Sequence, residues 1–404
     1  MICKDRPGQL AIFGGPPAFA EPTHVGRPNL GCRARFLQRV EELLDRRWLT
    51  NNGPLVREFE ERVAGLLAVR HCVALNNGTT ALELAIRAMG LEGEVIVPAM
   101  TFVATVNALR WSGLAPIFCD IDPATHNLDP KCVEELITPH TSAILAVHLW
   151  GRPCEVEALA EIALRHRLTL LYDAAHAFAC TRRGRMVGGF GDAEAFSFHA
   201  TKLLHTLEGG AITTDDDDLA ARLRLMRNHG LTPEGDVVRL GTNAKMNEIA
   251  AAMGLSLLEQ LDLLIATNRR NYLAYQAELR DLAGVGLIGY EPGEKHNFQY
   301  VVVEIDEPAA RIGRDRLMQI LRAENVLARR YYYPGCHRVE PYRHGQPQAS
   351  RALPATEQVL ERVLCLPSGE TIDQSAVRAI CSIIRTVVEN GSEVRRRLEA
   401  PRVA

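Results

Sequence analysis

Residues 168–202 read LTLLYDAAHAFACTRRGRMVGGFGDAEAFSFHATK, and this stretch carries the pattern that decides the fold. It contains two short apolar runs, Leu168–Asp173 and Ala193–Ser197, and each run ends in a polar side chain. Short apolar runs bounded by glycine and polar residues are typical of buried strands. We therefore predict two strands here, each followed by residues able to meet a ligand.

The same pattern continues on both sides of this stretch. Helical patterns at Phe102–Ser112 and Glu155–His166 alternate with further short apolar runs. These runs are Cys72–Leu75, Glu94–Pro98, Ala115–Asp120, Ala143–Val147 and Gly210–Thr214. Strands that alternate with helices of this length predict an α/β fold, with a mainly parallel sheet buried between helical layers. Ligands of such sheets bind at the carboxyl ends of the strands.

The regions outside this pattern predict two further units. Phe36–Leu67 has the pattern of two helices joined by a glycine-bearing loop, and Ala244–Leu264 that of one long helix. A smaller C-terminal α+β domain is predicted from a strand, a helix and a strand at Asn297–Ile305, Arg314–Glu324 and Leu327–Tyr333. The predicted organisation is an N-terminal arm at 1–30, a large domain at 31–265 and a small domain at 266–404.

Composition narrows the class of protein. The chain has 404 residues, 47% hydrophobic and 24% charged, as expected for a globular enzyme with a large core. A net charge of −3 gives no electrostatic footprint for nucleic acid or an anionic membrane, and we expect neither as a partner. The ten cysteines are scattered without zinc-ligand spacing, so no metal site is predicted. The sequence shows no signal peptide and no long apolar run, which predicts a cytoplasmic protein.

Asp173 and Lys202 are the residues whose positions suggest chemistry. A carboxylate at the end of an apolar strand is costly to bury without a cationic or hydrogen-bonding partner, and a protonated pyridine nitrogen would be such a partner. Lys202 lies just past a strand, where partial burial would lower its pKa and make the amine a usable nucleophile. Considered alone, Asp173 could instead be a helix N-cap, and Lys202 a solvated loop lysine.

A third feature is a predicted anion site. Gly78-Thr79-Thr80 opens a helix directly after a strand, so backbone N–H groups and the helix dipole converge there and could bind a phosphate. Ser197 could add a hydroxyl, although a threonine at this point could also be only a helix cap. The signatures of dinucleotide-binding, P-loop, zinc-protease and α/β-hydrolase enzymes are absent from the sequence. His199 and His205 flank Lys202 without metal-like spacing.

With these motifs the chain resembles the DegT/DnrJ/EryC1/StrS family of sugar aminotransferases, over roughly residues 10–390. That family has the aspartate-aminotransferase (type I pyridoxal-phosphate, PLP) fold. The motifs that carry the resemblance are Trp48-Leu-Thr-Asn-Asn-Gly-Pro54, Asn77-Gly-Thr-Thr-Ala-Leu82, Pro98-Ala-Met-Thr-Phe-Val-Ala-Thr105, Asp173-Ala-Ala-His-Ala177, Phe196-Ser-Phe-His-Ala-Thr-Lys202, Glu208-Gly-Gly-Ala211, Arg227-Asn-His-Gly230 and Arg330-Tyr-Tyr-Tyr-Pro334.

The resemblance implies a role for each matching residue. Lys202 would carry PLP as a Schiff base and move the proton, while Asp173 would hold the pyridine nitrogen. Phe102 would stack on the ring, and His176 would contact the oxygen side of the ring. The phosphate cradle would be formed by Gly78, Thr79, Ser197 and, from the neighbouring subunit, Asn243. The last residue implies a homodimer with a shared active site.

The resemblance also implies the reaction. L-glutamate would convert PLP to pyridoxamine phosphate, and a keto-deoxy sugar nucleotide would then accept the amine, most similarly to enzymes acting at C4 of dTDP-4-keto-6-deoxyglucose in antibiotic pathways. Tyr332, Tyr333 and His337 match positions that reach the substrate. Ala244-Lys245 and Leu207 depart from the common family pattern near the sugar-nucleotide site. A C3 aminotransferase, a PLP-dependent sugar dehydratase and a catalytically idle regulatory homologue remain as alternatives.

Overall fold

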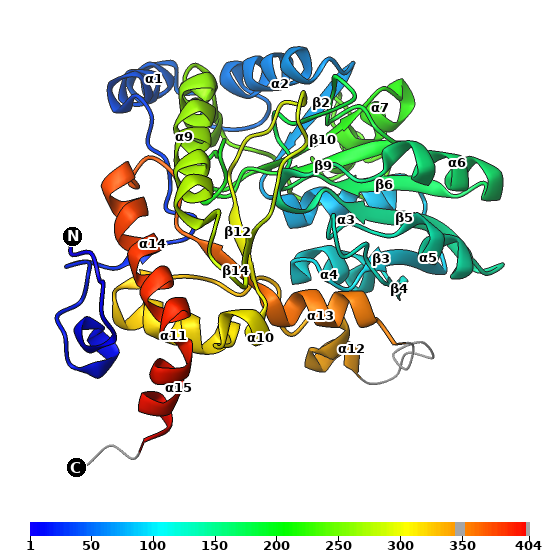
Figure 1. Ribbon diagram of the computed structural model, residues 1–404. Helices are drawn as coiled ribbons and strands as arrows, with labels where there is room; N and C mark the ends of the chain where they lie inside the picture. Colours follow the sequence, from blue (N-terminus) through cyan, green and yellow to red (C-terminus); the bar gives the residue numbers. More distant parts are fainter. Residues whose placement is uncertain (344–351, 401–404) are drawn as a thin grey trace.

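The computed structural model describes residues 1–343 and 352–400, and its centre is a seven-stranded sheet (Figure 1). In spatial order the strands are β2 (His71–Leu75), β10 (Gly210–Thr214), β9 (Ala193–Ser197), β6 (Thr169–Asp173), β5 (Thr141–Val147), β3 (Glu94–Pro98) and β4 (Ala115–Cys119). Only β10 runs antiparallel to its neighbours. The predicted mainly parallel sheet is therefore present.

Both faces of this sheet are covered by helices. One face packs on α3 (Gly78–Ala88), α4 (Val103–Trp111) and α7 (Asp217–Met226). The other packs on α2 (Pro54–Leu67), α5 (Pro130–Glu135), α6 (Val156–His166) and α8 (Glu248–Leu258). Successive strand residues alternate between the two cores, as the twofold period of a strand requires: Val73 and Leu75 belong to the first, Cys72 and Ala74 to the second. This double burial explains why the strands appear in the sequence as continuous apolar runs.

The C-terminal part forms a second core around a three-stranded antiparallel sheet. Its strands are β11 (Val285–Leu287), β12 (Val301–Ile305) and β14 (Val363–Leu366). The helices of this part are α9 (Leu261–Leu279), α10 (Glu307–Ala310), α11 (Arg314–Ala323), α12 (Glu340–Arg343), α13 (Pro354–Arg362), α14 (Gln374–Glu389) and α15 (Gly391–Glu399). The remaining elements of the large domain are α1 (Arg33–Arg46) and a small hairpin of β7 (Thr181–Arg182) and β8 (Arg185–Met186).

The N-terminal arm belongs physically to the small domain. Its strand β1 (Thr23–His24) pairs in parallel with β13 (Val326–Leu327), and Leu10 and Phe19 lie in the second core. The predicted boundary after residue 265 falls inside α9, where Leu264 packs in the large-domain core and Tyr275 in the small-domain core. The domain limits stay a prediction, since this helix joins the two cores.

Three predicted elements were wrong in extent, and one of them, the strand predicted at Asn297–Ile305, begins only at Val301. The single helix predicted at Ala244–Leu264 is two helices, α8 and α9, bent by 63°. The first of these begins only at Glu248, where the Asn247 side chain accepts a hydrogen bond from the Ala250 N–H as an N-cap. The strand predicted at Leu327–Tyr333 ends at Leu327, because the chain then turns away toward the sheet's carboxyl edge.

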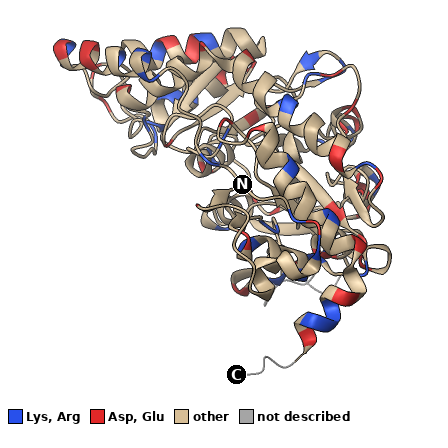
Figure 2. Cartoon of the chain, turned by 60° about the vertical axis from the view of Figure 1, so that its left-hand side comes forward, with Lys and Arg blue, Asp and Glu red and all other residues tan. Residues whose placement is uncertain are grey.

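In the described ranges, no helix by itself is long and apolar enough to cross a membrane. The bent pair α8 and α9 meets that criterion only when joined, and nearly all of α8 is buried in the large-domain core. Basic and acidic residues are interspersed along the chain (Figure 2).

Candidate active site

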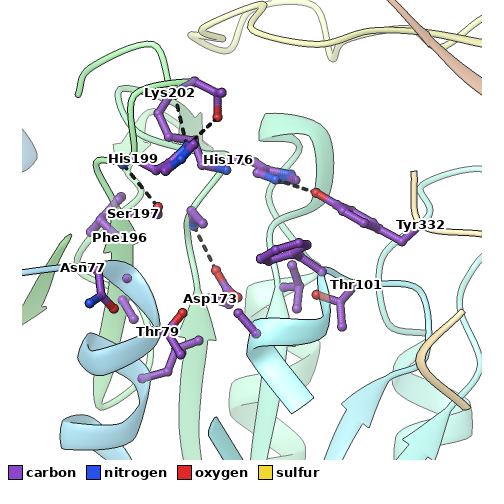
Figure 3. Close-up of a pocket in the computed structure, with 18 of the residues that line it drawn as sticks. Asn77, Thr79, Thr101, Asp173, His176, Phe196, Ser197, His199, Lys202 and Tyr332 are labelled. Atoms are coloured by element: carbon purple, nitrogen blue, oxygen red, sulfur yellow. Dashed lines mark hydrogen bonds between the residues drawn. The ribbon is translucent and has the colours of Figure 1, made fainter. Parts of the chain in front are cut away.

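A cavity of about 350 Å³ lies at the carboxyl ends of the central strands (Figure 3). Asp173 ends β6, Ser197 ends β9, Gly78 and Thr79 begin α3, and Lys202 lies on the loop after β9; all five line this cavity. In Figure 3, Thr79 and Tyr332 lie on opposite sides, with Asp173 between them. The edge of the sheet thus brings together residues that are more than 120 positions apart in the sequence, as the strand-end rule predicts.

Asp173 is a buried carboxylate with neutral partners. Its oxygens accept hydrogen bonds from the Thr105 hydroxyl at 2.8 Å and the Ala175 N–H at 3.0 Å. Burial raises the pKa of Asp173, while these hydrogen bonds and the charge of Lys202 act in the opposite direction. No helix begins after β6, so the N-cap alternative does not apply. The carboxylate is held in place, and none of the described residues forms an ion pair with it.

Lys202 presents an amine to the same cavity. Burial lowers its pKa to about 8, and the negative charge of Asp173 limits the decrease. Its Nζ lies 3.5 Å from the Tyr300 hydroxyl, and no carboxylate of the described residues forms an ion pair with it. The side chain is therefore a partly desolvated amine of which roughly a tenth is neutral at pH 7, far more than for a solvated loop lysine.

The turn at the start of α3 is packed too tightly for any residue but glycine. The N-cap is Asn77, whose side chain accepts from the Thr80 N–H at 2.8 Å, so Thr79 is not the cap and lines the cavity instead. A Cβ added to Gly78 would lie 2.8 Å from the Cβ of Ser197, and one added to Gly210 would lie 2.6 Å from the Asn77 carbonyl. Backbone N–H groups at a helix N-terminus next to two hydroxyls fit a phosphate.

The opposite side of the cavity is aromatic. His176 is buried, and its ring bonds on both sides: Nδ1 accepts from the Trp150 N–H at 3.3 Å, and Nε2 lies 3.0 Å from the Tyr332 hydroxyl. Burial keeps the pKa of His176 well below its usual range, with the charge of Lys202 adding to the effect. The imidazole is therefore neutral. Phe102, 56% exposed, has its ring 6.0 Å from that of Tyr332 and covers one side of the entrance.

These features together fit PLP. The cofactor needs a carboxylate for its pyridine nitrogen, a lysine amine for its aldehyde and an anion site for its phosphate. Asp173, Lys202 and the Gly78-Thr79 turn provide one of each around a single cavity. The tight fit of Gly78 against Ser197 brings the start of α3 and the serine close together at the predicted anion site.

Three predicted site residues do not line the cavity in this chain. Asn243 is exposed, and its side chain accepts a hydrogen bond from Lys245 Nζ at 2.8 Å. The ring of Tyr333 faces the guanidinium groups of Arg314 and Arg330. His337 faces Glu357, with 3.5 Å between Nε2 and the carboxylate. Of the predicted substrate residues, only Tyr332 lines the cavity.

Several residues of the site were missed in the sequence. Tyr300 and Tyr331 line the cavity from the small domain. Glu208 and His199 line it from the loops around Lys202 in the large domain. Thr105 orients Asp173. His199, Glu208 and Tyr331 lie in motifs that carry the family resemblance, whereas Tyr300 lies in none of them. Thr105 also had a signal, since Thr101 and Thr105 are one helical turn apart directly after a strand and their hydroxyls lie 2.8 Å apart.

Comparisons with known proteins agree with this geometry. Residues 32–385 match the DegT/DnrJ/EryC1/StrS aminotransferase family. The crystal structure of DesI in the presence of its TDP-sugar product superimposes with a TM-score of 0.93 and 52% identity, covering 97% of this chain and all of that one. A dTDP-4-amino-4,6-dideoxy-D-glucose transaminase from Shigella dysenteriae is 36% identical over 91% of this chain and 99% of its own. A GDP-perosamine synthase from Caulobacter vibrioides is 39% identical over 79% of this chain and 86% of its own.

These matches confirm the predicted α/β fold class and the predicted enzyme class. The sequence match covers both domains, and the superposition shows the same sheet and the same small C-terminal domain as in a solved member. The chain belongs to the DegT/DnrJ/EryC1/StrS aminotransferase family, whose members are PLP-dependent sugar-nucleotide aminotransferases.

Proposed function

We propose that this chain transfers the amino group of L-glutamate to C4 of dTDP-4-keto-6-deoxyglucose, with PLP and pyridoxamine phosphate as the two forms of its cofactor. The observation that carries the proposal is the convergence of Asp173, Lys202 and the Gly78-Thr79 turn on one cavity. The product would be a 4-amino-4,6-dideoxy sugar nucleotide, of the kind used to make antibiotic sugars.

Asp173 and Lys202 would be the catalytic pair. When bound, PLP supplies an electron sink that makes the α C–H of the amino donor acidic. The Asp173 carboxylate would hold the proton on the pyridine nitrogen, with Thr105 and the Ala175 N–H keeping it in position. The Lys202 amine, with a pKa near 8, would take the α proton of the amino donor and deliver it to the cofactor's C4′.

The other contacts would orient the cofactor. The N–H groups at the start of α3, with the hydroxyls of Thr79 and Ser197, would bind the phosphate. Phe102 would lie against one face of the ring, and neutral His176 would contact its oxygen side, held by Tyr332. Asn243 lies outside the cavity of its own chain, which fits a role in the cavity of a second subunit of a homodimer.

The sugar assignment rests on relatives. DesI was solved with its TDP-sugar product, and the Shigella enzyme is named for a dTDP-linked 4-amino sugar. The Caulobacter relative is named for a GDP-linked sugar, so the nucleotide has to be tested. Ala244-Lys245 and Leu207, where the chain departs from the common family pattern, do not line the cavity of their own chain.

The first experiment is an absorbance spectrum of the purified protein before and after addition of L-glutamate. We expect a visible band that glutamate bleaches in the wild type and that Lys202→Ala lacks. Lys131→Ala, which removes an exposed lysine of the same domain, is the control and should behave as wild type. A wild-type protein that binds no PLP would refute the proposal and leave the idle-homologue alternative.

The second experiment identifies the acceptor. The enzyme bleached by glutamate is mixed with dTDP-4-keto-6-deoxyglucose, a dTDP-3-keto sugar or a GDP-4-keto sugar. The return of the visible band is then followed. Fastest recovery with the first compound supports the proposal. Fastest recovery with the second would make the chain a C3 aminotransferase, and release of a deoxygenated sugar without amine would make it a dehydratase.

A further inference from the structure

Tyr300 is the residue of the cavity that no sequence pattern singled out and that contacts Lys202 directly. It lies just before β12 in the small domain, and 9% of the residue is exposed. Its hydroxyl is 3.5 Å from Lys202 Nζ, and its ring centroid is 4.4 Å from that of His176. A residue of the small domain thus contacts two predicted catalytic residues of the large domain.

The segment 297–300 that carries Tyr300 is bonded to the large domain along its length. The Asn297 side-chain amide donates to the carbonyls of His176 at 2.8 Å and Phe178 at 3.0 Å. Gln299 accepts a hydrogen bond from the Leu203 N–H at 2.9 Å, directly after the lysine. These bonds fix the segment both to the turn after β6 and to the loop that carries the amine.

Both the backbone carbonyl and the ring of Tyr300 make contacts that hold the residue in place. Its carbonyl accepts from the Tyr290 hydroxyl at 3.0 Å, and its ring packs edge-on against Trp150 with 5.5 Å between centroids. Burial raises the pKa of the Tyr300 phenol well above its usual range, so the group stays a neutral hydroxyl. A neutral hydroxyl can accept a hydrogen bond from the amine, but it forms no ion pair with it. The contact is therefore weak enough for the amine to leave it and react.

We infer that Tyr300 is a positioning residue whose phenol oxygen holds the ε-amino group of Lys202 at the cavity wall whenever that amine is not bonded to the cofactor. The kinetic consequence rests on the proposed function, because the amine is free only after the amino donor has reacted. The hydroxyl keeps the amine close to where it must act next as a proton carrier and nucleophile. It acts through Lys202 and need not touch the sugar.

Competitive labelling of cofactor-free protein tests this contact without any turnover. Trace acetic anhydride is applied over a pH series, and acetylated Lys202 is quantified in its peptide by mass spectrometry. Loss of an acceptor for the charged amine should move the labelling midpoint of Tyr300→Phe down by about half a pH unit, as expected for one long hydrogen bond. Tyr331→Phe removes a second phenol from the same cavity and should leave the midpoint unchanged.

Apart from the one phenol that each variant removes, the groups around Lys202 are the same in both variants. The titratable groups that line its cavity are Asp173 from β6, His176 from the following turn, His199 and Glu208 from the flanking loops, and Tyr331 and Tyr332 from the small domain. A difference between the two variants therefore reports the Tyr300 hydroxyl. If Tyr300→Phe does not fold, Tyr300→Met is measured in its place, because its flexible apolar side chain can fill the space of the ring without a hydroxyl.

A second measurement uses the PLP-loaded protein. After bleaching with glutamate, 2-oxoglutarate should restore the visible band about threefold or more slowly in Tyr300→Phe than in wild type, in line with the loss of one weak hydrogen bond. Labelling curves of Tyr300→Phe and wild type that coincide would overturn the inference. A wild type that fails to bleach would refute the proposed function instead, and the labelling result would still decide the role of Tyr300.

Discussion

Two walls of the cavity differ in how the chain builds them. We call one the cofactor wall, formed by Gly78, Asp173, Ser197 and Lys202. The other is the aromatic wall, formed by His176, Tyr300 and Tyr332. Except for the loop residue Lys202, the cofactor wall consists of strand ends and a helix start within one domain, whereas two of the three aromatic residues come from the small domain. The first wall depends on local backbone geometry and the second on how two cores pack.

We expect the cofactor wall to be the more rigid of the two and the aromatic wall to adjust more easily. The cofactor wall is fixed by close backbone contacts, such as Gly78 against Ser197, in which a single added carbon would clash. The aromatic wall is joined by single side-chain hydrogen bonds, such as Tyr332 to His176. Substitutions in the first wall should therefore have larger effects than those in the second.

The largest effect is expected for Asp173→Asn. Under the proposed function, loss of the carboxylate would leave the pyridine nitrogen without its counter-charge, and we expect the single-turnover rate with glutamate to fall by about 10²–10³-fold, as for loss of an electrostatic partner in a buried site. Asp192→Asn is the control, because Asp192 accepts from the Leu170 N–H near the opposite end of the same strand. Equal losses of rate in both variants would mean that Asp173 acts only on stability.

Gly78→Ala should come next. The added Cβ would lie 2.8 Å from the Ser197 Cβ, so we expect the free energy of unfolding to fall by about 1–3 kcal/mol, as for other overpacked sites. Denaturant unfolding measures it. Gly65→Ala is the control, since a Cβ there meets nothing within 4 Å and should stabilise α2 by about 0.5–1 kcal/mol. An unchanged stability of Gly78→Ala would show that this wall is not rigid.

Lys202→Met tests how much the burial of the charged amine lowers the free energy of unfolding of the cofactor-free protein. The pKa of Lys202 is about 8 in the folded chain against an ordinary value of 10.5, so between these values the unfolded chain binds more protons and wild-type stability rises with pH. Below about pH 8 the folded protein bears the whole cost, and the variant should be about 1–2 kcal/mol more stable, a figure reduced for partial exposure.

The pH profile of that difference is the decisive part. The advantage of Lys202→Met should be constant below about pH 8 and shrink as the pH approaches 10.5. Urea unfolding at several pH values measures it. A constant advantage across the whole range would assign the effect to packing rather than to charge.

The smallest effect is expected in the aromatic wall, for Tyr332→Phe. It removes one hydrogen bond of 3.0 Å to His176 and should lower the free energy of unfolding by about 0.5–1.5 kcal/mol. Tyr333→Phe, whose ring lies between arginine side chains, should have less effect. Thermal unfolding compares the two. A loss for Tyr332→Phe larger than that of Gly78→Ala would reverse the order of the two walls.

The sequence predicted the large domain better than the small one. The strands that end at Asp173 and Ser197 and the helix that starts at Gly78 lie where their apolar runs and glycine predicted them. In contrast, Asn297–Ile305 was predicted as one strand, although its first four residues leave the sheet to contact the catalytic loop. Alternation of apolar residues indicates a strand but does not reveal which of its residues pair with another strand.

The sequence alone identified the family through the motifs that carry the resemblance. It also predicted the α/β class and the positions of the cofactor-wall residues, because strand periodicity, strand-end position and a glycine turn are local properties of the chain. Only the tertiary structure decided the aromatic wall: the contact of Tyr300 with Lys202, the bond of Tyr332 to His176, and the exclusion of Tyr333 and His337 from the cavity. These positions depend on how the small domain packs against the large one. That packing is set by many long-range contacts at once, and no stretch of sequence contains them.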